Sequence, residues 1–185
     1  PKAQAIEDDM IVHWLKNLDR YCEDPKTAPN LFKLGRKTSK MAYKDTMILS
    51  HMLLMRGYVW LTLSSGARTG EILSLPIENV NGKDMTRNIY KMKVIGQEVT
   101  TTLPPFIQDR IRPMIAYIKE YEPEALVLFA EEENKKGKGT IDPRLLQELV
   151  KGSMIASGMP PTTPGRYHRL HDMRKVWARW IDENG

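Results

Sequence analysis

The chain has very little cysteine and lacks a long uninterrupted hydrophobic run. Cys22 is the single cysteine among 185 residues, so no internal disulfide can form and no cysteine cluster can hold a metal. This usage favours a reducing compartment, and we expect a cytoplasmic location, which would be the host cytoplasm for a viral or plasmid-borne protein. The longest apolar-rich stretch, residues 47–63, is interrupted by His51, Arg56 and Gly57, which argues against a membrane span.

We expect no signal peptide at the start of the sequence, which begins with Pro1 and not with methionine. We therefore expect an excerpt of a longer protein. Its apolar fraction of 41% and charged fraction of 28% are ordinary for a globular domain of this length. The net charge of +5 suits a polyanionic partner, although this charge alone does not decide between a nucleic-acid-binding protein and another basic protein.

Residue patterning predicts a mainly helical chain with one small antiparallel sheet, which is an α+β fold. Helices are predicted over residues 6–21, 45–64, 107–121, 143–158 and 171–180. Strands are predicted over residues 88–95 and 98–103, with the chain reversing at Gly96 and Gln97. Asn81 and Gly82 indicate a further tight turn, and residues 131–139 are charged and glycine-rich, as in a loop.

Residues 26–44 contain six basic side chains and no acidic one. Two interpretations stand side by side: a solvated loop leading into a helix, or a strip that contacts phosphates.

The first candidate for chemistry is the sequence Ala-Arg-Thr-Gly-Glu at residues 67–71. It follows a buried helix and begins a new one, so Arg68 projects from a turn that the core holds in place. A guanidinium there can bind two phosphate oxygens with its planar fork. The alternative is an ordinary ion pair between Arg68 and Glu71, three residues further on.

The second candidate is the sequence His-Asp-Met-Arg at residues 171–174. Helical spacing places His171 and Arg174 on one face, where one can move a proton and the other can neutralise an oxyanion. A capped or solvated helix start is the alternative. A zinc site is disfavoured because His168 and His171 have no cysteine partners.

The third candidate is the predicted hairpin, where Lys91 and Lys93 share one face of the first strand because side chains alternate along a strand. Such lysines either face solvent or reach into a DNA groove as proton donors.

Taken in order, these segments resemble the catalytic domain of tyrosine recombinases, the family of phage integrases and chromosome-dimer resolvases. The resemblance covers about residues 6–185. Residues 65–75, SGARTGEILSL, are similar to the family's first box, and the hairpin ending at Leu103 and Pro104 is similar to its lysine-bearing segment. Residues 154–159, MIASGM, match the helix end that precedes the second box, and residues 171–180, HDMRKVWARW, match that box.

The resemblance implies a role for each matching residue. Arg68 and Arg174 would clamp the scissile phosphate, and His171 would handle a proton. Lys93, with Lys91 in reserve, would protonate the departing 5′ oxygen. No metal, nucleotide or other cofactor is implied. Double-stranded DNA would be the partner, together with further protomers in a tetrameric synapse. Further DNA contacts are expected from Arg36, Lys37, Lys40, Lys91, Arg166, Arg169 and Lys175.

Two departures from the family accompany the match. The nucleophilic tyrosine lies beyond the second box in the family, whereas none of the seven tyrosines here follows Arg174, and Tyr167 precedes the box. We therefore expect residues 1–185 to form a single catalytic domain without the tyrosine segment and without the N-terminal DNA-clamping domain, inactive in cleavage unaided. A noncatalytic DNA-binding or regulatory module and a type IB topoisomerase remain alternatives. Lys175 replaces a histidine that is usual in the family, which would alter local DNA contacts.

Overall fold

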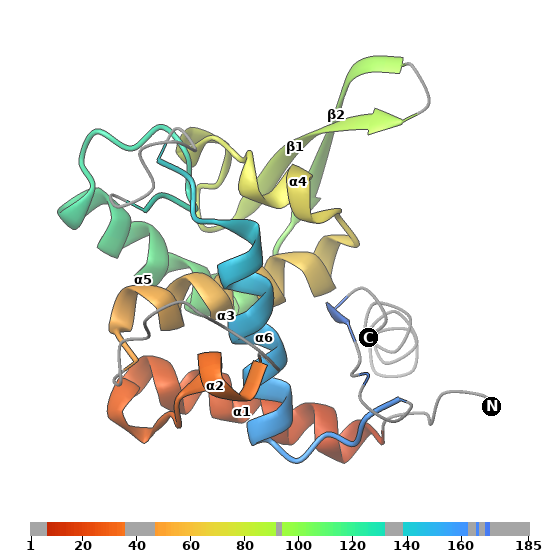
Figure 1. The fold of residues 1–185 in the computed structure, drawn as a ribbon. Coiled ribbons are helices and arrows are strands. Elements are labelled where there is room, and N and C mark those ends of the chain that lie inside the picture. The colour runs from red at the N-terminus through yellow and green to blue at the C-terminus, as the bar shows by residue number, and fades with distance from the viewer. Residues whose placement is uncertain are drawn as a thin grey trace. The chain divides into compact units, whose positions relative to one another are not determined.

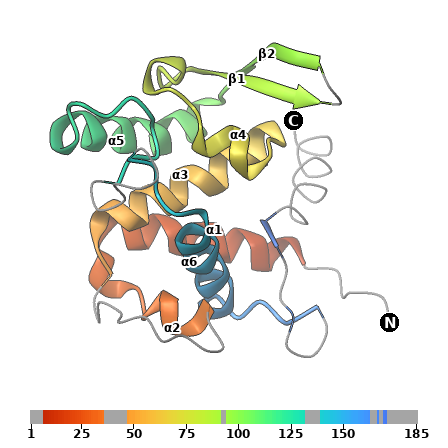
Figure 2. The ribbon, with the colours of Figure 1, turned by 45° about the horizontal axis from the view of Figure 1, so that its top comes forward.

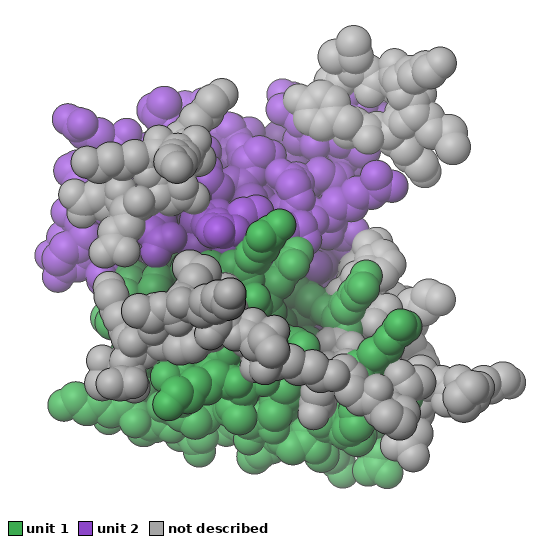
Figure 3. Space-filling view, in the orientation of Figure 1, with its two compact units in different colours: residues 1–59, 144–185 green, residues 60–143 purple. Residues whose placement is uncertain are grey.

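The computed structural model describes residues 7–35, 47–91, 94–131, 139–162, 166, 169 and 170. These residues form a mainly helical structure with one two-stranded antiparallel sheet, which confirms the predicted α+β class (Figure 1). The chain divides into two compact units, residues 1–59 with 144–185 and residues 60–143 (Figure 3). None of the described helices is both long and apolar enough to cross a membrane.

The unit of residues 1–59 and 144–185 is helical. It contains α1 (Asp8–Glu23), the short 3-10 helix η1 (Pro25–Thr27), α2 (Leu31–Gly35), the first part of α3 (Leu49–Ser65) and nearly all of α6 (Pro143–Ala156). Helix α1 forms where the amphipathic pattern predicts it and buries Trp14, Leu18 and Tyr21. Polar links join α1 to α6 and to the residue that follows it: Trp14 Nε1 donates to Ser153 Oγ at 2.8 Å, and Asn17 Nδ2 donates to Ser157 Oγ at 3.0 Å.

Helices α2 and α6 pack closely because glycine stands at both contact points. A Cβ atom on Gly152 of α6 would overlap the carbonyl group of Leu31, and one on Gly35 of α2 would overlap the carbonyl oxygen of Glu148. Any larger residue at either position has to push the two backbones apart.

The unit of residues 60–143 contains the rest of α3, α4 (Thr69–Leu73), the short 3-10 helix η2 (Ile77–Asn79), strands β1 (Asp84–Lys91) and β2 (Val94–Thr102), and α5 (Pro105–Tyr121). The strands form an arm beside α4 (Figures 1 and 2). Helix α5 buries Ile111, Met114, Ile115 and Ile118, as its periodicity predicts. After α5 the chain returns to the segment that follows α4, where Pro76 pairs with Val127.

The predicted position of the hairpin turn is wrong. Lys91 pairs with Val94, so the chain reverses between them and not at Gly96 and Gln97. Two β2 residues lie opposite one β1 residue between the pairs Ile89–Gln97 and Lys91–Val94, so the glycine falls at a bulge inside a longer strand. The β-branched Val94 and Ile95 before Gly96 and the β-branched run of residues 99–102 after it favour a continuous extended strand.

The other predicted turn is confirmed. Asn81 Oδ1 accepts hydrogen bonds from the backbone N–H groups of Lys83 and Asp84, at 2.9 and 2.8 Å, and Gly82 has a φ of 81°. Strand β1 starts directly after this turn, four residues earlier than expected. The helix predicted over residues 171–180 and most of the loop at residues 131–139 lie outside the described residues.

Candidate functional site

The turn that follows α3 is held by hydrogen bonds within the unit of residues 60–143. Gly66 has a φ of 67°, and its N–H donates to the carbonyl oxygen of Thr62 at 2.8 Å, which ends α3. Ser65 Oγ donates to the carbonyl oxygen of Leu61 at 2.6 Å and accepts from the N–H of Ala67 at 3.1 Å. Ala67 is buried, so the backbone just before Arg68 is fixed from both sides.

Arg68 comes directly before α4, with an extended backbone (φ −79°, ψ 156°). Its N–H donates to Glu71 Oε2 at 3.1 Å, so the Glu71 carboxylate braces the backbone of Arg68. Ile72 and Leu73 then anchor α4 in the core. The alternative that pairs the Arg68 guanidinium with Glu71 is not observed.

The side chain of Arg68 is exposed, and within the described part of the structure it has no ion-pair or hydrogen-bonding partner. A guanidinium with its donors available, mounted on a fixed turn, can bind an external anion without first breaking an internal contact.

A second arginine, in strand β1, donates a hydrogen bond to the same turn. Arg87 of β1 is only 8% exposed, and its Nη2 donates to the carbonyl oxygen of Ser65 at 3.3 Å. Its Nε and Nη1 are buried, and the described residues supply no hydrogen-bonding partner for them. Met85, two residues earlier on the strand, is fully buried, as expected for side chains that share the inner face of β1.

The sequence did not single out Arg87 because the predicted strand began at residue 88. With the observed start at Asp84, strand alternation places Arg87 on the same inner face as Met85 and Ile89. An arginine in an apolar strand face is the signal that would have found it.

Most of the other predicted site residues lie outside the described part of the chain. Lys93, His171 and Arg174 lie outside the described residues, as do Arg36, Lys37, Lys40 and Lys175. Lys91 ends β1, but its side chain is not described, so the predicted sharing of one strand face by Lys91 and Lys93 stays a prediction. Arg166 and Arg169 are exposed. Of the four predicted catalytic side chains, Arg68 is therefore the one whose surroundings are known.

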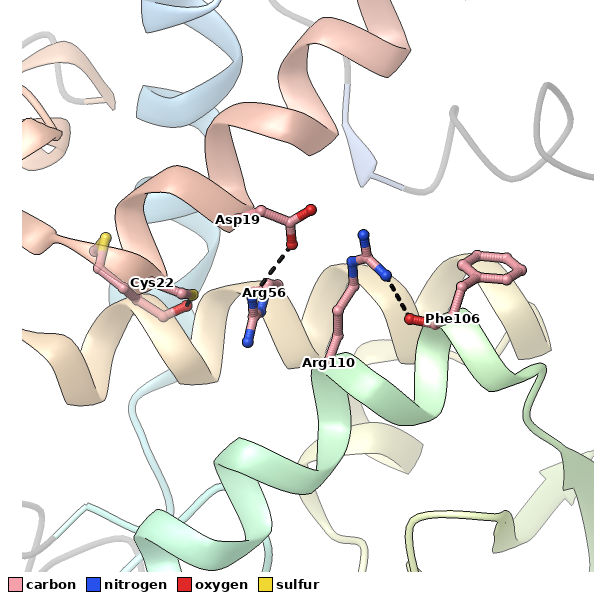
Figure 4. Close-up of polar contacts among 6 residues, drawn as sticks. Asp19, Cys22, Arg56, Phe106 and Arg110 are labelled. Atoms are coloured by element: carbon pink, nitrogen blue, oxygen red, sulfur yellow. Dashed lines mark hydrogen bonds and ion pairs between the residues drawn. The ribbon is translucent and has the colours of Figure 1, made fainter.

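Two further polar clusters are structural in character, and each lies within a single unit (Figure 4). In the helical unit, Arg56 Nη1 of α3 forms an ion pair with Asp19 Oδ1 of α1 at 3.2 Å. In the unit of residues 60–143, the guanidinium of Arg110 lies 5.2 Å from the centre of the Trp60 ring, and Arg110 also donates to the carbonyl oxygen of Phe106. Each contact ties one helix to another or to its own preceding turn.

Cys22 faces the same α1–α3 contact. Its Sγ donates to the carbonyl oxygen of Met52 at 3.3 Å, and burial raises the pKa of the thiol to about 12 (Figure 4). The thiol is therefore protonated at neutral pH and poorly suited to nucleophilic chemistry. Among the described residues, no three histidine, cysteine, aspartate or glutamate side chains gather in a way that could hold a metal ion.

Comparison with known proteins adds no assignment. No protein-family model matches the chain, and no match was found among curated proteins.

Proposed function

We propose that this chain is the catalytic domain of a tyrosine recombinase that cuts and rejoins DNA by transesterification. The observation that carries the proposal is the Arg68 guanidinium, which is exposed and has no partner within the described residues, on a turn fixed by Ser65, Gly66 and Glu71. The other support comes from the sequence, in which the two boxes and the hairpin follow one another in the order of that family.

In the proposed reaction, a tyrosine hydroxyl oxygen attacks a phosphorus atom of the DNA backbone. A bond forms between that oxygen and phosphorus, and the bond from phosphorus to the 5′ oxygen breaks. The products are a 3′-phosphotyrosyl link and a free 5′ hydroxyl. Attack by the 5′ hydroxyl of another strand reverses these steps and joins the DNA. The phosphodiester energy is kept in the covalent link, so no external energy source is needed.

The arginines supply electrostatic stabilisation in this mechanism. A tyrosine hydroxyl has a pKa of about 10 and is a weak nucleophile at neutral pH. Arg68 and Arg174 would lower the barrier by neutralising the non-bridging oxygens as negative charge builds on the phosphate. The fixed turn favours this role for Arg68 because little reorganisation is needed when the phosphate binds.

The remaining residues would move protons. His171 would handle the proton of the attacking hydroxyl, and Lys93, or Lys91 in its place, would donate a proton to the departing 5′ oxygen. Because no tyrosine of this chain follows Arg174, we place the nucleophile in a segment beyond these residues or in a neighbouring protomer. Double-stranded DNA and further protomers are the proposed partners, in the cytoplasm.

A suicide-substrate trap on the full-length protein tests this function. The DNA site carries a nick a few nucleotides beyond the scissile phosphate. After attack, the short fragment with the new 5′ hydroxyl diffuses away and cannot reverse the reaction, so the covalent intermediate accumulates as a slowly migrating band. Arg68→Ala is expected to slow band formation by about 100- to 1000-fold, the usual effect of removing one transition-state donor. Arg68→Lys keeps the charge but loses the planar fork, so its rate of band formation should fall between those of the unaltered protein and Arg68→Ala.

Lys119→Ala is the matched control, because it removes an exposed positive charge from the end of α5 that lies away from α4 (Figure 1). This variant should form the band at the original rate. The proposal is contradicted if the full-length protein binds DNA without forming a covalent band, or if Arg68→Ala forms it as fast as the unaltered protein.

A further inference from the structure

Arg87 is buried in a way that arginine side chains seldom are. It is 8% exposed, yet within the described residues it has no carboxylate partner, and its Nε and Nη1 have no acceptor. Buried guanidinium groups are normally paired, since removing the charge from water is costly. Its one hydrogen bond runs from Nη2 to the carbonyl oxygen of Ser65.

The partner of Arg87 is part of a helix end. Ser65 is the last residue of the 17-residue helix α3, and its carbonyl is among those that the helix itself leaves unbonded. The partial negative charge at a helix C-terminus favours a cation there. Arg87 therefore satisfies the end of α3 and gains some compensation for its buried charge from the same contact.

Ser65 also links this contact to Arg68. Its carbonyl oxygen accepts from Arg87, while its hydroxyl accepts from the N–H of Ala67, the residue directly before Arg68. Gly66, between them, has the positive φ that turns the chain away from α3. A displacement of Ser65 would thus be passed to the backbone of Arg68 through only two intervening residues.

We infer that Arg87 is a positioning residue, which holds the end of α3 so that the Arg68 guanidinium is presented at a fixed place to a DNA phosphate. This inference rests on the proposed function. In this role Arg87 would not itself contact the phosphate, because its Nε and Nη1 atoms are closed off from solvent and its Nη2 is bonded to the Ser65 carbonyl.

The first test measures binding of a fluorescein-labelled DNA duplex to the 185-residue chain between about 50 and 200 mM salt. Loss of one phosphate contact lowers the slope of log affinity against log salt by about 0.9. We expect Arg68→Ala to show this loss and Arg87→Met to show most of it. The double variant should bind no more weakly than Arg68→Ala alone, because Arg87 acts through Arg68.

Two control variants separate positioning from simple charge removal. Lys119→Ala gives the effect of losing one surface charge, and the loss in Arg87→Met should exceed it. Arg87→Lys can still donate to the Ser65 carbonyl and should recover most of the affinity. If Arg87→Met does not fold, Arg87→Leu replaces it with the same expectations, since it also removes both the charge and the donor to the Ser65 carbonyl.

The second test needs no DNA. Amide hydrogen exchange at Arg68, whose N–H is bonded to Glu71, and at Gly66 should accelerate in Arg87→Met but not in Arg87→Lys, while exchange in α1 stays unchanged. Unchanged exchange at Arg68, or a loss of DNA affinity in Arg87→Met that multiplies with that of Arg68→Ala, would overturn the inference. An Arg68→Ala variant that binds DNA as well as the unaltered chain would instead overturn the proposed function.

Discussion

At the scale of single residues, Arg68 and Arg87 carry the same guanidinium group in opposite surroundings. Arg68 is exposed, and the carboxylate of Glu71 accepts a hydrogen bond from its backbone N–H and not from its side chain. Arg87 is buried and bonded to a helix end. The Arg68 guanidinium is therefore accessible to an external phosphate, whereas we infer that Arg87 acts by positioning Arg68.

Sequence patterns predicted one of these two arginines. Arg68 stands in a contiguous motif that can be recognised without knowing the fold. Arg87 acquires its role only through its contact with Ser65, 22 residues earlier in the chain. No local pattern specifies such a contact, and an error of four residues in the start of β1 was enough to hide it.

Also at the residue scale, Cys22 is predicted to react slowly while the protein is folded. Burial raises the pKa of its thiol from 9.0 to about 12, so the reactive thiolate is scarce at neutral pH. Alkylation by iodoacetamide at mildly alkaline pH should be on the order of a hundredfold slower in native buffer than in urea. Equal rates in the two conditions would contradict the partly buried position of the thiol, and a Cys22→Ala variant controls for reaction at other side chains.

The same shift has a consequence for stability. A raised pKa means that the folded state holds the proton more tightly than the unfolded chain does. The contribution to the free energy of unfolding is therefore fully present below about pH 9 and is lost as the pH rises toward 12. The Cys22→Ala variant should lose less stability over this alkaline window than the unaltered protein.

At the scale of elements, the positions of α1, α5 and α6 followed from the sequence, whereas the short helix α2 and the position of the hairpin turn did not. Helices α1, α5 and α6 each bury one face, so apolar spacing marks them clearly. In the hairpin, glycine indicated a turn, but Gly96 sits at a bulge within β2. Glycine occurs both in turns and at bulges, and only the pairing of Lys91 with Val94 shows that Gly96 lies at a bulge.

The contact between α2 and α6 gives a prediction at this scale. Gly152→Ala should destabilise the protein by about 1–3 kcal/mol or more, because the added methyl group meets the backbone of Leu31, which cannot rotate away. The measurement is the urea midpoint followed by circular dichroism.

Gly70→Ala in α4 is the matched control. Nothing lies within 4 Å of a Cβ atom at Gly70, and alanine is favoured over glycine inside a helix by about 0.5–1 kcal/mol. This variant should be as stable as the unaltered protein or slightly more stable. A Gly152→Ala midpoint equal to that of Gly70→Ala would show that the two helices are not packed as closely as described.

At the scale of the whole molecule, the proposed site depends on two distant parts of the chain. Arg68 belongs to the unit of residues 60–143, whereas His171 and Arg174 belong to the other unit and lie outside the described residues. The sequence motifs predicted which residues belong to the proposed site. Whether they meet depends on how the chain brings together segments about a hundred residues apart, which spacing along the sequence does not determine.

The most direct measurement of the central claim is a cross-link between residues 68 and 174. In the double variant Arg68→Cys/Arg174→Cys, made in the Cys22→Ala background because the native thiol is only partly buried, a short bifunctional maleimide should join the two positions within one chain, detected as linked peptides by mass spectrometry. The pair Lys119→Cys/Arg174→Cys is the control. We predict efficient linkage of residue 68 to residue 174 and little linkage of residue 119 to residue 174. Linkage of 68 to 174 that is no more efficient than the control would contradict a shared phosphate site for the two arginines.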